Sequence, residues 1–318
     1  MSAKSHQHVP AVTATRPPAR TVREAYDRAL SATDGRSRFV ELPSGRRLHV
    51  VEAGDGPTLV HLHGTSTCGL SHVPLLARMP QVRSVLVDRP GAGLTEGRPV
   101  PAKGYREGVV ALMDELLDTV SDGPVALAGA SMGGTWALWY ALARPGRVLR
   151  LALLGAAPFL PGTEAPVGLR LSVVPWIDAL TRRLVPASRS TVARFMRLMG
   201  EEDTICDHLD VLDGLVAGRR DPIQAKATRD EFRVGISLFA RAGMKPSMRI
   251  TAHELRRLTM PTLLVWGDQD PIGSVDAARE IARTIPDARL EVLHAGHVPW
   301  LGHPDRVAEL LDTFLSGE

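Results

Sequence analysis

Six short apolar runs recur along this chain, and helical segments separate most of them. Each run has the length of a β-strand and is apolar almost throughout, instead of alternating between apolar and polar residues. Continuous apolar runs are typical of strands buried on both faces, and alternation with helices implies parallel pairing through crossover connections. The runs therefore predict a mostly parallel, doubly wound α/β sheet. They cover residues 58–62, 83–87, 125–130, 149–154, 262–266 and 290–293.

Two further β-prone runs come first in the chain, at residues 38–42 and 47–53, and Pro43-Ser44-Gly45 lies between them. Proline, serine and glycine favour a tight turn, so these runs predict an antiparallel hairpin and a sheet of about eight strands. From Val109 to Val120, apolar residues recur at three- and four-residue spacing. This spacing predicts an amphipathic helix that packs on the sheet.

The alternation of strands and helices stops at about Pro158 and resumes at Met260 and Pro261. The residues between them have a mainly helical pattern, and we interpret them as an inserted helical cap. The predicted organisation is an N-terminal tail with a short helix (1–37), a core domain (38–157 together with 260–318) and the cap (158–259). We refer to residues 158–259 as the cap segment.

Composition excludes several classes of protein. The 318 residues are 44% hydrophobic and 23% charged, which is typical of a packed globular fold. The net charge of +3 comes from scattered arginines, so we expect no nucleic-acid partner. Only Cys68 and Cys206 are present, so a disulfide framework is not indicated and a reducing compartment is expected.

Neither the leader nor the rest of the chain carries a membrane signal. The first residues lack the apolar core of a signal peptide, and we expect a disordered tail there in preference to a transit peptide. No window approaches the roughly 20 apolar residues that a membrane-spanning helix needs. The expected location is therefore cytoplasmic, without a membrane partner.

The segment Gly129-Ala130-Ser131-Met132-Gly133 joins the apolar run 125–130 to a helical pattern. In this context a sharp turn presents the serine Oγ above the sheet, and the helix directs its N–H groups toward developing negative charge. A serine that caps the helix is the competing interpretation. The flanking glycines favour a nucleophile.

A serine nucleophile needs a base within hydrogen-bond reach, and an acid must hold that base in the correct tautomer. Asp268 and Asp270 follow the run 262–266, and His294 and His297 follow the next run. The order serine, aspartate, histidine is the one this type of sheet uses.

From about residue 38 to the C-terminus, these motifs resemble the α/β-hydrolase superfamily. The resemblance implies that Asp270 is the acid, with Asp268 as a loop-capping residue, and that His297 is the base in preference to His294 and His303. Members of this superfamily often have a glutamate five residues after the histidine, where this chain has Gly302. That departure affects only how the loop is anchored.

The resemblance extends to two earlier loops. His61-Leu62-His63-Gly64-Thr65 is similar to the oxyanion loop, which implies that the N–H groups of Thr65 and Met132 are the oxyanion donors. His63 either fixes this loop or contacts substrate. The turn from Asp88 to Thr95 resembles an architectural feature of the superfamily.

The function that follows is hydrolysis of a carboxylic ester or lactone through an acyl-enzyme, with no metal and no cofactor. The expected partner is a small apolar compound with a carbonyl group. The cap segment should enclose the site, with Trp176, Met196 and Met199 as candidate substrate contacts besides His63. Two alternatives remain open: a carbon–carbon bond hydrolase, against which Ala130 argues because many such enzymes have asparagine there, and a ligand sensor that keeps the hydrolase fold.

Overall fold

The structure is a computed structural model that describes residues 17–97, 99–201 and 204–317. Among these residues it contains one eight-stranded sheet in the order β1-β2-β4-β3-β5-β6-β7-β8. The prediction for the first residues as a tail falls on 1–16, outside the described residues. The strands are β1 Arg36–Glu41, β2 Arg47–Ala53, β3 Thr58–Leu62, β4 Arg83–Val87, β5 Val125–Ala130, β6 Val148–Leu154, β7 Thr262–Gly267 and β8 Ala288–Leu293.

The predicted mostly parallel sheet is confirmed. β1 and β2 form the expected antiparallel hairpin, and β2 also pairs antiparallel with β4. The strands from β3 onward pair parallel. β5 and β7 are buried at every residue, which explains their continuous apolar sequence.

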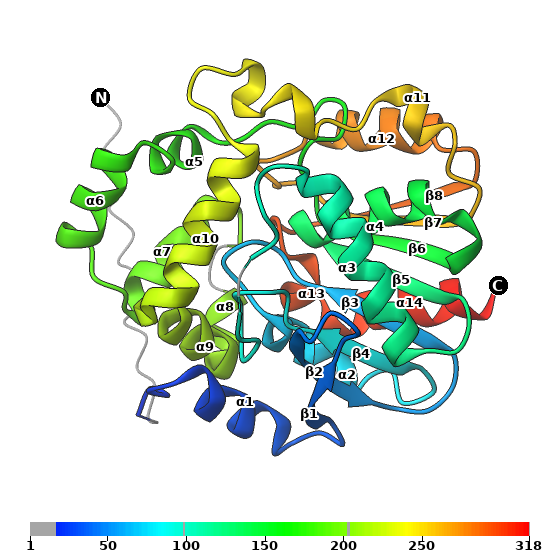
Figure 1. The fold of residues 1–318 in the computed structure, drawn as a ribbon, viewed down its shortest axis with the longest axis horizontal. Coiled ribbons are helices and arrows are strands. Elements are labelled where there is room, and N and C mark those ends of the chain that lie inside the picture. The colour runs from blue at the N-terminus through cyan, green and yellow to red at the C-terminus, as the bar shows by residue number, and fades with distance from the viewer. Residues whose placement is uncertain (1–16, 98, 202–203, 318) are drawn as a thin grey trace, which may run out of the picture.

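Helices cover both faces of the sheet (Figure 1). Successive strand residues belong to opposite cores: Leu127 packs in one, and its neighbours Ala126 and Ala128 pack in the other. The first core includes helices α3 and α4, and the second includes α1, α2 and α14. The helices outside the cap segment are α1 Val22–Leu30, α2 Val73–Leu76, α3 Tyr105–Val120, α4 Met132–Ala143, α12 Val275–Thr284, α13 Pro299–Gly302 and α14 Pro304–Ser316.

The cap segment follows β6 and precedes β7, and its helices gather beside the sheet at the left and top of Figure 1. Its α-helices are α5 Val167–Ser172, α6 Pro175–Leu184, α7 Arg189–Leu198, α8 Thr204–Asp207, α9 Leu209–Arg220, α10 Pro222–Gly235 and α11 Ala252–Leu255. The short 3-10 helices of the chain are η1 Gly69–His72, η2 Pro145–Arg147, η3 Arg241–Gly243 and η4 Pro246–Met248. The division of the chain into a core domain and a cap stays a prediction.

Candidate active site

Ser131 lies at the sharp turn between β5 and α4. Its backbone has φ 51° and ψ −120°, a strained conformation for a residue with a Cβ atom. Although Ser131 is the N-cap residue of α4, its side chain makes no capping hydrogen bond. Helix capping therefore does not explain this serine, and its Oγ is left for another role.

The glycines on either side of Ser131 allow this turn. A Cβ atom on Gly129 would lie 2.5 Å from the carbonyl oxygen of Gly133, and one on Gly133 would lie 2.0 Å from that of Leu62. Gly64 also brings the loop after β3 close to Ser131, because a Cβ atom there would lie 3.0 Å from the Cβ atom of Ser131. The turn is thus closely packed against β3 and the loop that follows it.

His297 and Asp270 form a buried pair beside this turn. Asp270 follows β7, His297 follows β8, and the Nδ1 atom of His297 lies 2.8 Å from Oδ2 of Asp270. The Asp270 carboxylate also accepts the N–H groups of Ala156 and Ile272, each at 2.9 Å. Because a carboxylate accepts here, Nδ1 of His297 donates, and Nε2 remains as the basic nitrogen.

The surroundings of His297 favour its protonated form. Burial alone would lower the pKa of His297, but the charge of Asp270, the hydrogen bond to Asp270 and the charge of Glu201 outweigh burial and raise it above the ordinary value of 6.5. A proton on this imidazole is therefore stabilised by two carboxylates.

The cap segment fixes the loop that carries His297. The carbonyl of Met199 accepts the N–H of His297 at 2.9 Å, and the carboxylate of Glu201 accepts the N–H of Val298. Glu201 is only 2% exposed, and the Thr204 hydroxyl donates to it at 3.2 Å. Burial raises the pKa of Glu201 despite the hydrogen bond from Val298.

Glu201 was missed in the sequence analysis. The one signal was Gly302, which stands where members of the superfamily often have a glutamate that anchors this loop. A Cβ atom on Gly302 would lie 3.3 Å from Cγ2 of Thr204. The carboxylate that anchors this loop is thus supplied by the cap segment.

One cavity of about 90 Å³ contains both Ser131 and His297. Thr65, Met132, Met196 and Met199 line the same cavity. The remaining wall is mainly apolar and comes largely from the cap segment. It includes Phe159, Leu169, Phe195, Leu215, Phe232, Ile236 and Met244.

Trp176 does not line this cavity, and its role as a substrate contact stays a prediction. It lies on α6 with 69% of its surface exposed and does not line the cavity wall. An apolar side chain in a helical pattern marks a helix face, but the pattern does not say whether that face meets a cavity or solvent.

His63 fixes the loop after β3. Its Nδ1–H donates to the carbonyl of Gly64 at 2.7 Å, and its Nε2 accepts the N–H of Arg89 at 3.0 Å. Both nitrogens are therefore occupied, and burial lowers the pKa of His63 to about 4. His63 lines a neighbouring cleft of about 540 Å³ and not the cavity that contains Ser131.

A buried ion pair joins this region to the cap segment. Both nitrogens at the end of the Arg89 guanidinium bind the carboxylate of Glu231 on α10, and Tyr105 donates to the same carboxylate at 2.8 Å. Burial would raise the pKa of Glu231, but Arg89 outweighs it and the pKa is lowered. Arg89 lies in the turn from Asp88 to Thr95 but was assigned no role of its own, and Glu231 lies in no recognisable motif.

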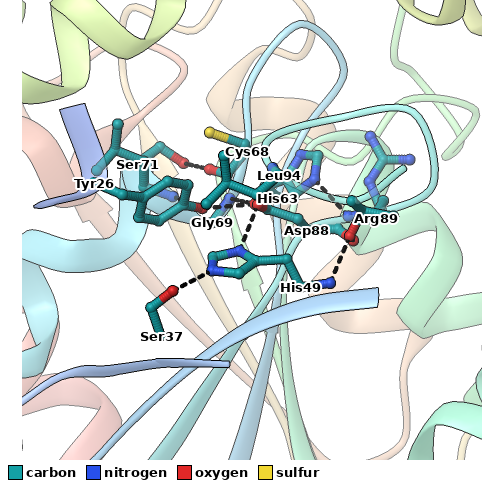
Figure 2. A network of polar contacts seen from close by, with 12 residues as sticks. Tyr26, Ser37, His49, His63, Cys68, Gly69, Ser71, Asp88, Arg89 and Leu94 are labelled. Atoms are coloured by element: carbon teal, nitrogen blue, oxygen red, sulfur yellow. Dashed lines mark hydrogen bonds and ion pairs between the residues drawn. The ribbon is translucent and has the colours of Figure 1, made fainter. Parts of the chain in front are cut away.

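A second serine–histidine–aspartate chain occurs at Ser37, His49 and Asp88 (Figure 2). The Ser37 Oγ lies 2.8 Å from Nε2 of His49, and Nδ1 of His49 lies 2.7 Å from Asp88. None of the three lines the cavity of Ser131.

Asp88 has a structural role. Its carboxylate also accepts the Tyr26 hydroxyl at 2.6 Å and the N–H groups of Gly69 and Leu94, both at 2.7 Å (Figure 2). These donors come from α1, η1 and the turn after β4, so the expected architectural role of that turn agrees with its contacts. Cys68, beside Gly69, is buried, and burial raises the pKa of its thiol.

Within the part of the chain that the structure describes, no helix is both long and apolar enough to cross a bilayer. Nor do three or more potential metal ligands cluster anywhere in that part.

Comparison with known proteins gives the family. The alpha/beta hydrolase fold family matches residues 57–304. The pimeloyl-[acyl-carrier protein] methyl ester esterase of Xanthomonas campestris pv. campestris is 30% identical over 275 residues, covering 85% of this chain and 99% of the relative.

Solved structures have the same fold. Carboxylesterase CesB from Bacillus subtilis superimposes with a TM-score of 0.69 at 20% identity, covering 93% of this chain and 98% of that one. Naproxen esterase from Bacillus subtilis superimposes with a TM-score of 0.64 at 22% identity, covering 92% and 96%. With a family match over most of its length, the chain belongs to the alpha/beta hydrolase fold family and is a hydrolase of the esterase type.

Proposed function

We propose that this protein hydrolyses carboxylic esters with Ser131 as nucleophile, His297 as general base and Asp270 as the acid that orients His297. The observation that carries this proposal is the pair of His297 and Asp270. His297 donates its Nδ1–H to Asp270, so Nε2 is left as the basic nitrogen. His297 also lines the same cavity as Ser131.

The reaction proceeds by acyl transfer. Ser131 Oγ attacks the ester carbonyl while His297 takes its proton, and the resulting imidazolium is stabilised by Asp270. His297 then protonates the leaving alcohol, which departs and leaves an acyl-enzyme on Ser131. Water, activated by His297, releases the acid in the second half of the reaction.

Thr65 and Met132 supply the oxyanion donors in this proposal. Met132 begins α4, so its N–H is among those that have no partner within the helix. Thr65 lies next to Gly64, which approaches Ser131 closely. Donors aimed at the developing negative oxygen typically contribute roughly 2.7–4 kcal/mol each to transition-state stabilisation.

The substrate class follows from the cavity and from the relatives. The wall around Ser131 is mainly apolar, which suits an acyl chain. The curated relative named above is described as acting on a methyl ester. We therefore expect esters of small alcohols with aliphatic acids, and lactones as a related group.

Covalent labelling tests the nucleophile. A fluorophosphonate probe should modify the wild-type protein at Ser131, as located by peptide mass spectrometry, and Ser131→Ala should abolish both labelling and ester hydrolysis. Ser37→Ala is the matched control, because Ser37 also bonds to a histidine but lies outside the cavity. Labelling that persists in Ser131→Ala and disappears in Ser37→Ala would contradict the assignment.

The same purified protein separates the alternatives. Turnover of a diketone in place of an ester would favour carbon–carbon bond hydrolysis. A burst of a single equivalent of product without further turnover would favour a sensor.

A further inference from the structure

Arg219 is a cation in the cavity wall, and none of the described residues is an anionic partner for it. It lies near the C-terminal end of α9 and lines the cavity that contains Ser131 and His297. Its guanidinium lies 4.6 Å from the ring centroid of Phe195. Among the described residues, no side chain or carbonyl forms an ion pair or hydrogen bond with it.

The other charged groups of this cavity are compensated. Glu231 is paired with Arg89, and His297 with Asp270. Burial lowers the pKa of Arg219, with no nearby carboxylate to oppose the effect. An arginine nevertheless remains charged at every relevant pH. The cavity therefore holds one positive charge that an incoming molecule can neutralise.

Outside the cavity the positive charge continues. A groove of about 570 Å³ shares Phe195, Leu215 and Arg219 with the cavity. Of the charged residues that line this groove, five are arginines and one is an aspartate. They are Asp178, Arg182, Arg194, Arg219, Arg220 and Arg229. Positive potential along a groove attracts anions toward its inner end.

We propose that Arg219 binds a carboxylate carried by the ester substrate, so that the enzyme prefers esters with a second, anionic end. This inference rests on the proposed esterase function. The ester carbonyl lies at Ser131, the apolar wall accommodates the chain, and the carboxylate reaches the guanidinium, which matches a carboxylate in two-point geometry. The wall near Arg219 includes Phe195 and Leu215.

Hydrolysis of paired esters tests this assignment. The substrates are monomethyl esters of straight-chain dicarboxylic acids, and each is compared with the dimethyl ester of the same acid, which lacks the charge. We expect Arg219→Met to lower kcat/KM for the monomethyl esters by about 10- to 100-fold, mainly through KM, since a hydrogen-bonded ion pair is lost. The dimethyl esters should react as they do with the wild-type protein, which also checks that the variant is folded.

Two further variants test whether the effect is specific to the guanidinium of Arg219. Arg219→Lys keeps the charge without the planar fork and should retain an intermediate preference. Arg279→Met is the control, because Arg279 lies on α12, lines neither the cavity nor the groove, and pairs with Asp276 at 2.9 Å. An equal ratio of monomethyl to dimethyl kcat/KM in wild type and Arg219→Met would overturn the assignment of the carboxylate to the acyl side.

A second set of esters shows which side of the ester bond carries the carboxylate that Arg219 binds. Alkanoate esters whose alcohol portion carries the carboxylate show whether Arg219 binds the alcohol side instead of the acyl side. Sensitivity to Arg219→Met in one set alone identifies the side, and insensitivity in both sets overturns the inference.

Binding distinguishes this inference from the esterase function. If the wild-type protein hydrolyses no ester, the esterase proposal fails, and calorimetry with straight-chain dicarboxylates then tests Arg219 alone. Binding that weakens about 10-fold or more in Arg219→Met supports the anion site, and binding that is absent or unchanged rejects it.

Discussion

At the scale of single residues, two carboxylates from different parts of the chain influence His297. Asp270 comes from the loop after β7, whereas Glu201 comes from the cap segment and anchors Val298, the neighbour of His297. In the proposed mechanism, Asp270 acts by a direct hydrogen bond and Glu201 is a positioning residue that also contributes negative charge.

The pH dependence of hydrolysis should reflect both carboxylates. His297 must be neutral to act as a base, and its pKa is raised above 6.5, so kcat/KM should rise with pH through a midpoint above that value. Glu201→Gln should shift the midpoint to lower pH, because one of the charges that stabilise the imidazolium is removed. Glu309→Gln, at an exposed position of α14, serves as the control. An unchanged midpoint in Glu201→Gln would show that this carboxylate has no electrostatic role.

Replacing the proposed acid should have a much larger effect. In Asp270→Asn the side chain no longer stabilises the imidazolium or the required tautomer, and comparable triads lose about 10⁴-fold in kcat. Asp268→Asn is a matched control in the same loop, since Asp268 bonds to His294 and to the N–H of Ala295. Steady-state kinetics on one ester compares the two. Equal losses would argue that the whole loop, and not Asp270, was disturbed.

At the scale of secondary-structure elements, the close contact between β3 and α4 determines the position of Ser131. A side chain at Gly133 would collide with the carbonyl of Leu62, which is backbone and cannot rotate away. We expect Gly133→Ala to destabilise the protein by about 1–3 kcal/mol through overpacking and to reduce hydrolysis. Gly146→Ala, where a Cβ atom meets nothing within 4 Å, is the control. Thermal unfolding measures both, and equal melting temperatures for the two variants would contradict this view.

At the scale of the whole molecule, a buried aspartate joins the N-terminal helix region to the cap segment. Asp213 on α9 is fully buried and accepts the N–H of Ala19 at 2.8 Å. It also binds Arg189, at the start of α7, through two nitrogens at 2.6 and 2.8 Å. This carboxylate thus connects α7, α9 and the segment before α1.

Breaking this connection should be costly. Asp213→Ala removes the carboxylate that binds Arg189 and accepts the Ala19 N–H, and removal of one member of a buried ion pair typically costs about 3–5 kcal/mol. Urea unfolding gives the loss, and the double variant Asp213→Ala, Arg189→Met should recover part of it. A double variant as unstable as the sum of the single variants would show that the two side chains do not interact.

The sequence by itself determined the sheet and the turn that carries Ser131. The starts and ends of β3, β4 and β5 match the predicted runs, because a strand buried on both faces must be apolar along its whole length. Gly129 and Gly133 could equally be recognised from the sequence. Each lies where the backbone approaches another segment more closely than any side chain permits. The strand runs and the turn at Ser131 consist of consecutive residues, so they leave a local pattern in the sequence.

Only the tertiary structure decided what the cap segment contributes. Glu201 reaches the His297 loop, Glu231 pairs with Arg89 across the fold, and Trp176 lies outside the cavity. These outcomes depend on contacts between residues far apart in the chain and on which face of a helix meets the cavity. Helical periodicity identifies an apolar face, but packing alone selects its neighbour. For the same reason, the position of Arg219 is informative only in the structure. The other charged groups of the cavity are paired there, and Arg219 has no anionic partner among the described residues.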